Sequence, residues 1–367
     1  MDIDSLLRLL NEKKGSDLHL KVGRPPMIRV SGVLAPTEHE RLSPDEIKGL
    51  IYSMMTSERV KIFESEKEID FSYSLPGLAR FRVNIFMQRG TPAAVIRMVP
   101  YSVPTVEELK LPEILKELCL RERGLVLVTG ATGSGKSTTL AALINHVNNN
   151  RQCHIITIED PIEFLYKDIK ASVCQREIGL DTQTFKEALR RILRQDPDVI
   201  LIGEMRDTTT IETALTASET GHLVFSTLHT NDAAQSIDRI IDVFPSEQQQ
   251  QIRIQLSASL VGVVSQRLLK KAAGEGRIAA VEVMINSPTI QKLIEEGDTT
   301  SLSKTIEESA TFWKMQTLNQ ALAKLVKDRV VTEEEALVAS NNPEDLKLKF
   351  RGVSTGAPSP GEEYEFY

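Results

Sequence analysis

One nine-residue segment, Gly130–Thr138, restricts the possible folds of this chain more than any other feature. It reads Gly-Ala-Thr-Gly-Ser-Gly-Lys-Ser-Thr and fits the pattern G-x-x-x-x-G-K-[ST] without a mismatch. An apolar run at 125–129 precedes it, and a helix-compatible run at 139–144 follows it. This order predicts a strand, a phosphate-binding loop and a helix whose positive N-terminus faces the anion.

The residue types in this segment suit the phosphates of a nucleotide. Its glycines allow backbone angles that are closed to other residues and let the backbone approach a phosphate closely. Lys136 is expected to reach the β- and γ-phosphates, and Ser137 to offer its hydroxyl to Mg²⁺. We therefore expect ATP or ADP with Mg²⁺, held by the whole segment: Gly130, Ala131, Thr132, Gly133, Ser134, Gly135, Lys136, Ser137 and Thr138.

The first hundred residues predict a separate α+β domain. Residues 17–22 alternate as a half-buried strand does, and further strands are expected at 27–30, 69–75, 79–88 and 93–100. Ser43 and Pro44 form a typical helix start, and a second helix is expected at 57–66. Residues 101–112 predict a linker, which a helix at 109–120 joins to the next domain.

Residues 113–285 predict an α/β core. Strands expected at 125–129, 154–158, 199–202 and 223–227 alternate with helices, including a basic one at 185–194. Such alternation is typical of a parallel sheet covered on both faces. From 256 onward the pattern is largely helical, including the apolar stretch 258–269, with one more strand at 277–285. Helices at 289–296, 303–309, 315–327 and 333–340 predict a C-terminal helical subdomain over 286–350, followed by a disordered tail at 351–367.

Acidic and histidine residues follow the predicted parallel strands, at the edge where open α/β sheets bind ligands. Glu204 ends an apolar strand, as an acidic Walker B residue does, and is expected to bind Mg²⁺ through water. Glu163 is the candidate base that polarises water, and His229 the candidate that contacts the γ-phosphate. A surface carboxylate is the alternative for each glutamate, and a packed histidine is the alternative for His229 and His222.

Arginines stand out in the first domain. Arg80 and Arg82 share one face of a predicted strand, because side chains alternate with period two, and Arg89 and Arg97 lie on or beside strands. A solvated sheet face explains them without any ligand. The alternative is that some of them reach an anionic ligand, because a guanidinium group suits phosphate.

Charge and composition narrow the classes of function. The net charge of −7 and the pI near 5.6 argue against a large surface for non-specific nucleic-acid binding. No apolar run approaches the roughly 20 residues that span a bilayer, so we expect a cytoplasmic protein with at most a peripheral membrane role. Cys119, Cys153 and Cys174 are far apart and form no C-x-x-C pair. They predict reduced, mostly buried thiols and no zinc site.

Four segments together resemble the nucleotide boxes of the secretion ATPases. Gly130–Thr138, Ile158–Phe164, Ile202–Asp207 and Gly221–Asn231 resemble their Walker A, Asp, Walker B and His boxes. Their order and spacing resemble the type II secretion and type IV pilus branch. Gly15–Leu20, Arg80–Asn84 and Met315–Leu322 resemble its PilT group, so that the likeness covers about residues 1–350.

The resemblance implies a PAS-like N-terminal domain, a RecA-like ATPase domain and a homohexameric ring. Nucleotide then lies between the two domains, where Arg80, Arg82 and Arg89 help to hold the phosphates. Members of this group drive pilus retraction, and with it twitching motility, by acting on an inner-membrane platform protein. The resemblance thus implies a cytoplasmic motor, peripheral at the inner membrane and without nucleic acid as a partner.

One helical segment departs from the group's pattern. PilT proteins typically carry A-I-R-N-L-I-R-E where this chain has Thr289–Glu296, and both arginines are replaced. That stretch resembles accessory PilU-type paralogues, which leaves open an accessory motor, or an adaptor without significant turnover, that depends on a paralogous retraction ATPase. A translocating ATPase of a conjugation system is the third alternative.

Overall fold

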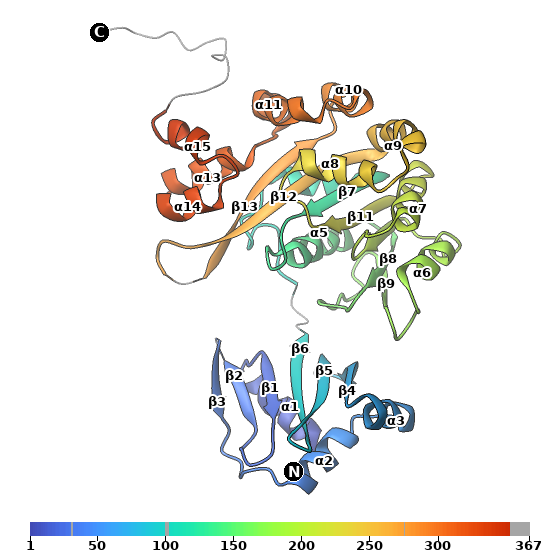
Figure 1. Ribbon diagram of the computed structural model, residues 1–367, viewed down its shortest axis with the longest axis vertical. Helices are drawn as coiled ribbons and strands as arrows, with labels where there is room; N and C mark the ends of the chain where they lie inside the picture. Colours follow the sequence, from blue (N-terminus) through green and yellow to red (C-terminus); the bar gives the residue numbers. More distant parts are fainter. Residues whose placement is uncertain (31, 100–102, 275, 353–367) are drawn as a thin grey trace. The chain divides into compact units, whose positions relative to one another are not determined.

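The computed structural model of the protein describes residues 1–30, 32–99, 103–274 and 276–352 (Figure 1). The chain divides into two compact units, Met1–Ser102 with Glu163–Leu165, and Val103–Ile162 with Tyr166–Tyr367. The expected tail from 353 onward lies outside the described residues, as do Tyr101 and Ser102 of the expected linker.

The first unit is an antiparallel sheet with helices packed on it. Its strand order is β3-β2-β1-β6-β5-β4, and the buried side chains of α1 and α2 share one core with Phe81, Val83 and Ile85 of β5. The capping box predicted at Ser43 is present at the start of α2. The elements are α1 (Ile3–Glu12), β1 (Asp17–Leu20), β2 (Met27–Val30), β3 (Val33–Pro36), α2 (Pro44–Tyr52), α3 (Ser57–Glu66), β4 (Glu68–Leu75), β5 (Ala79–Gln88) and β6 (Thr91–Val99). Among these, β3 was not predicted.

The second unit is built on a seven-stranded sheet with the order β13-β12-β7-β11-β10-β8-β9. Neighbouring strands from β12 to β9 run parallel, and only the β12–β13 pair is antiparallel. The strands are β7 (Gly124–Thr129), β8 (His154–Glu159), β9 (Ser172–Glu177), β10 (Val199–Ile202), β11 (Leu223–Leu228), β12 (Leu260–Lys270) and β13 (Arg277–Ile285). The helix α4 (Ile114–Cys119) precedes these strands, and the helices between them are α5 (Lys136–Asn150), α6 (Phe185–Ile192), α7 (Thr208–Glu219), α8 (Ala233–Asp242) and α9 (Ser246–Ser259).

The helical prediction for 258–269 is wrong, because α9 ends at Ser259 and β12 follows at once. This strand lies between β7 and β13 and is largely buried, so it lacks the alternation that marks a half-buried strand. Its valines, Val261, Val263 and Val264, were the signal for a strand. The helix expected at 109–120 is also shorter, since α4 covers only Ile114–Cys119.

The C-terminal helices belong to two different hydrophobic cores. Ile290 of α10 and Leu302 of α11 join the main core of the second unit. Leu322 of α13 and Leu346 of α15 instead form a small separate core with Leu269 of β12, and Figure 1 shows α13, α14 and α15 gathered beside the β12–β13 hairpin. The helices are α10 (Pro288–Glu296), α11 (Leu302–Glu308), α12 (Ala310–Trp313), α13 (Leu318–Lys327), α14 (Glu333–Ala339) and α15 (Pro343–Phe350).

The three cysteines differ in burial. Cys119 is buried, whereas Cys153 is half-buried and Cys174 is exposed, so the expectation of mostly buried thiols is wrong for Cys174. Burial raises the pKa of the Cys119 thiol to about 12, which makes it unreactive. Within the described ranges, each helix is either too short or too polar to cross a bilayer.

Candidate functional site

The predicted phosphate-binding loop connects β7, a central strand of the parallel sheet, to α5. Gly130, Gly133 and Gly135 have φ angles of 144°, 79° and 90°, which other residues rarely adopt. A Cβ atom at Gly130 would lie 2.5 Å from the backbone oxygen of Gln266 and 2.6 Å from Ser134 Oγ. Glycine is therefore required there for space as well as for backbone conformation.

The lysine of this loop is folded onto the loop itself. Lys136 Nζ donates to the backbone oxygen of Gly130 at 2.8 Å and to that of Ala131 at 3.0 Å, and the residue is only 8% exposed. The Ser134 hydroxyl is buried and has no hydrogen-bond partner among the described residues. A buried polar atom without a partner indicates a place where a ligand or a water completes the hydrogen bonding. The loop thus holds a buried ammonium group and a buried hydroxyl that suit an anion.

A cluster of charged side chains lies at the carboxyl ends of β10 and β11. Glu204 Oε1 is 2.6 Å from Arg206 Nε and 3.2 Å from His229 Nε2. The hydrogen bond from Arg206 is the main cause that lowers the pKa of Glu204, and the charges of His229 and Lys136 add to it. Glu204 is therefore an ionised carboxylate within the electrostatic reach of the loop lysine.

The oxygen atoms at this edge fit Mg²⁺. Ser137 is exposed in the first turn of α5, and Glu204 provides a carboxylate. Mg²⁺ prefers oxygen ligands and usually keeps several waters, with one or two carboxylates and substrate phosphates completing its shell. In the described part of the chain no group of three His, Cys, Asp or Glu side chains is placed to hold a metal. These residues fit an ion that is shared with a nucleotide and not held by a protein cage.

The second predicted histidine has a structural place. His222 Nδ1 lies 2.9 Å from the backbone oxygen of Ala217, and the His222 backbone N–H donates to the same oxygen at 3.1 Å. His222 thus satisfies a carbonyl in the last turn of α7, which agrees with the packed-histidine alternative. Of the two histidines, only His229 contacts Glu204.

The remaining candidates belong to other parts of the molecule. Glu163 is exposed in the loop after β8, in the short segment that groups with the first unit. Arg80 and Arg82 lie on the face of β5 opposite its buried core residues, and Arg82 pairs in register with Arg97 of β6. Arg89 lies in the turn between β5 and β6 with a φ of 49°. The structure therefore brings together the phosphate loop, Glu204 and His229 within the second unit, whereas Glu163, Arg80, Arg82 and Arg89 belong to the first unit.

Two residues that contact this site were not predicted from the sequence as site residues. Arg206 was seen within its segment, but its pairing with Glu204 depends on how the loop after β10 turns. Gln266 was missed because β12 was taken as helical, although it contacts both the phosphate loop and α5. The signal in the sequence for Gln266 was that it follows the β-branched residues Val263 and Val264, which favour a strand.

Known proteins resemble this chain along nearly its full length. A profile of the family described as Type II/IV secretion system protein matches residues 2–340. The type IV pilus retraction ATPase PilT of Pseudomonas aeruginosa is 49% identical over 346 residues, which cover 94% of this chain and 100% of that protein. The type IV pilus ATPase PilU of the same organism is 43% identical over 351 residues, 96% of this chain and 92% of that one.

A solved structure agrees with these sequence relationships. The crystal structure of the pilus retraction motor PilT with bound ADP superposes with a TM-score of 0.88 at 46% identity, covering 95% of this chain and 99% of that one. The predicted fold class, a PAS-like α+β domain followed by a RecA-like ATPase domain with C-terminal helices, is confirmed. The chain belongs to the type II/IV secretion system protein family.

Proposed function

We propose that the protein is an ATP-hydrolysing hexameric motor that powers type IV pilus retraction. The observation that carries this proposal is the meeting of the phosphate loop, Glu204 and His229 at one sheet edge, in a chain that matches PilT over all of that protein's length. That relative is named a retraction ATPase, and the solved PilT structure contains ADP.

We assign each residue of the site a separate role in hydrolysis of the terminal phosphate bond. The N–H groups of Gly130–Thr138 and the ammonium group of Lys136 bind the phosphates, and for this Lys136 leaves the two carbonyl oxygens that it now contacts. Ser137 and Glu204 would hold Mg²⁺, the glutamate through water, and Mg²⁺ would spread the charge of the phosphates. His229 is placed beside Glu204 to contact the γ-phosphate, and Glu163 orients and polarises the attacking water.

Charge neutralisation completes this assignment. Arg80, Arg82 and Arg89 are proposed to hold phosphate oxygens in the assembled ring, because a guanidinium group presents a fork of donors to phosphate. The ring acts at the cytoplasmic side of the inner membrane on the pilus platform protein. Nucleic acid is not expected as a partner.

The test separates binding from hydrolysis. Lys136→Ala is expected to lose nucleotide binding, and Glu163→Gln to bind ATP but not turn it over. Phosphate release with Mg-ATP and binding of a fluorescent ADP are measured for both, with Glu334→Gln on the exposed face of α14 as a matched control. Full ATPase activity in Glu163→Gln would show that this residue is not the catalytic base. If the wild-type protein turned over ATP no faster than Lys136→Ala, the proposal that the protein is an ATP-hydrolysing motor would be wrong.

An accessory role is the second candidate, and α10 favours it. At the positions where PilT proteins carry arginines, this helix has Gln291 and Glu295, and Glu295 accepts a hydrogen bond from Ser257 of α9 at 2.9 Å. Glu295 is thus hydrogen-bonded to α9. Twitching on agar decides between the roles: an autonomous motor restores motility to a strain that lacks every paralogue, and an accessory one restores it only when a partner motor is present.

A further inference from the structure

Gln266 of β12 joins the phosphate loop to the adjacent strand. Its side-chain Nε2 donates to the backbone oxygen of Ser134 at 2.5 Å, and its Oε1 accepts from Thr139 Oγ1 at 2.8 Å. Gln266 and Thr139 are each 2% exposed, and Ser134 is 6% exposed. Both ends of this amide are therefore hydrogen-bonded to groups that are shielded from bulk solvent.

We propose that Gln266 is a positioning residue that sets the phosphate loop in its anion-binding shape, an inference that rests on the proposed nucleotide-binding function. The peptide group between Ser134 and Gly135 is planar and trans, so its C=O and N–H point in opposite directions. Because Gln266 holds the Ser134 oxygen toward β12, the Gly135 N–H points away from β12. The amide thereby fixes the direction of one of the loop's anion-binding donors.

The loop glycines show how closely β12 approaches. A Cβ atom at Gly130 would lie 2.5 Å from the backbone oxygen of Gln266, and one at Gly135 would lie 3.0 Å from its Nε2. Two of the glycines in the motif thus make room for this one residue, in addition to any phosphate. The contact is continued on the helix, since Thr139 lies in the first turns of α5.

Only a side chain with a donor and an acceptor at this reach can make both contacts. Glutamine has both, and a protonated glutamate has both as well. An ionised glutamate has only acceptors, so two oxygen atoms would face each other at Ser134. A methionine has a similar volume but can make neither bond well.

This difference gives a test with its own pH signature. Fluorescent-ADP affinity is measured at pH 6 and pH 8 for the full chain and for Gln266→Glu, Gln266→Met, Thr139→Val and the exposed-surface control Gln251→Glu. At pH 8 Gln266→Glu is expected to lose about 10- to 100-fold in affinity, as does Gln266→Met at both pH values. At pH 6 Gln266→Glu recovers most of the loss, because burial raises the pKa of the introduced carboxyl and its protonated form restores the donor.

Each outcome decides the matter. Recovery of Gln266→Glu at pH 6, with a loss for Gln266→Met that does not vary with pH and a smaller loss for Thr139→Val, supports the positioning role. Wild-type affinity in Gln266→Met at both pH values overturns it and leaves the proposed function intact, provided that Lys136→Ala still abolishes binding. If the wild-type protein binds no ADP, the proposed function and this inference fall together. Circular dichroism of each variant shows that the fold is kept.

Discussion

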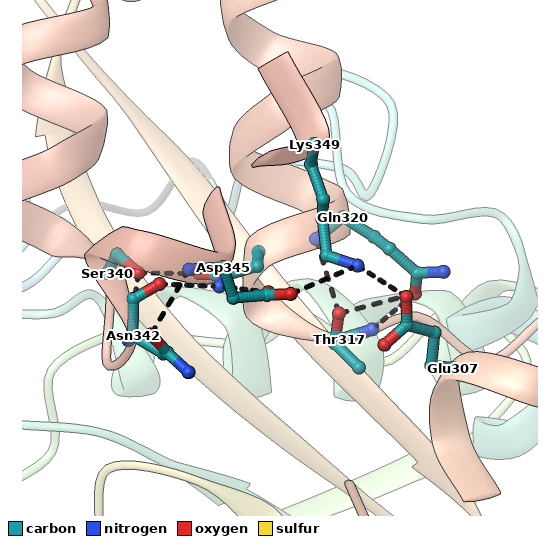
Figure 2. A network of polar contacts seen from close by, with 8 residues as sticks. Glu307, Thr317, Gln320, Ser340, Asn342, Asp345 and Lys349 are labelled. Carbon is teal, nitrogen blue, oxygen red and sulfur yellow. Dashed lines mark hydrogen bonds and ion pairs between the residues drawn. The ribbon is translucent and has the colours of Figure 1, made fainter. Parts of the chain in front are cut away.

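Two polar clusters of the second unit differ in how their groups are satisfied. The C-terminal network comprises Glu307, Thr317, Gln320, Ser340, Asn342, Asp345 and Lys349, which Figure 2 labels, together with Asn319. Within it Asn319 donates to Asp345 at 2.7 Å and accepts from Ser340 at 2.6 Å. Thr317 and Asn342 are also the N-caps of α13 and α15, so the network closes the helix ends it joins.

The phosphate loop is satisfied in a different way. Its lysine contacts the carbonyl oxygens of its own loop, and its Ser134 hydroxyl is buried without a partner in the described ranges. In a cluster that stabilises the fold, each polar group is hydrogen-bonded to another group of the protein. In a ligand site, some polar groups lack such a partner or can exchange it for an incoming ligand. The comparison therefore predicts that changes in the loop affect binding, and that changes in the C-terminal network affect stability.

Lys136→Ala is expected to have the largest effect, and it should change ligand binding without changing stability. Because the ammonium group is the charged donor of the loop, its removal is expected to weaken ADP binding by at least about 100-fold. The thermal midpoint of the free protein changes little, since the two carbonyl oxygens can bind water in its place. Calorimetric titration and thermal unfolding check both parts, with exposed Lys292→Ala as control. A large drop in the midpoint without loss of affinity would contradict the comparison.

Glu204→Gln has the second largest expected effect and concerns the cluster of Glu204, Arg206 and His229. A loss of about 100-fold in ATP turnover is expected, because the carboxylate charge beside Lys136 and His229 is removed while the shape is kept. ADP affinity is expected to change less than tenfold. Steady-state phosphate release and ADP titration measure the two quantities. Unchanged turnover would show that Glu204 only anchors Arg206.

Much of this site could be predicted from the sequence, because its signals are local. The glycines of Gly130–Thr138 and the apolar runs around them determine a strand, a loop and a helix within one short segment. Glu204 and His229 each follow a strand, and parallel strands bring their carboxyl ends to one edge whatever lies between them in the sequence. Hence their proximity followed from topology alone.

What could not be predicted depends on contacts between distant segments. Gln266 is more than 120 residues from the loop it contacts, and β12 lacks the alternation that would have marked it as a strand. The division of the C-terminal helices into two cores depends on where the β12–β13 hairpin ends. Cys174 is exposed because β9 is an edge strand of the sheet, which composition does not reveal.

Lys349→Met tests the stability side of the comparison. The Lys349 ammonium contacts Glu307 and lies 3.7 Å from Asp345, and its side chain is only 10% exposed. Removing it leaves two partly buried carboxylates without their cation, at an expected cost of about 2 kcal/mol in the unfolding of α13–α15. Urea unfolding followed by helical circular dichroism measures this, because Trp313, the single tryptophan of the chain, packs on the main core and not on the core of α13–α15. ATP turnover per folded molecule should stay the same, and a matching fall in turnover would mean that the two clusters are not separate.

Glu282→Gln is expected to have the smallest effect on stability. It tests the residue that connects the helix after the His229 loop with the C-terminal network. Glu282 of β13 is 6% exposed and accepts from the backbone N–H of Ala233, the first residue of α8, at 2.8 Å. It also accepts from that of Leu318, the first residue of α13, at 3.4 Å. One carboxylate thus joins the helix that follows the His229 loop to the helix that begins the C-terminal network.

The pH dependence of stability should reveal this junction. Burial, with the charge of Asp232 as a smaller cause, raises the pKa of Glu282 to about 7 from the ordinary glutamate value of 4.5. Between these values the folded protein binds more protons than the unfolded chain, so the free energy of unfolding falls as pH rises. From pH 6 to 7.5 this group lowers it by about 1 kcal/mol. Glu282→Gln cannot ionise, and its urea midpoint by Trp313 fluorescence should lose that slope. An identical slope in the variant would mean that Glu282 stays ionised throughout, held by the two helix N-termini against the cost of its burial.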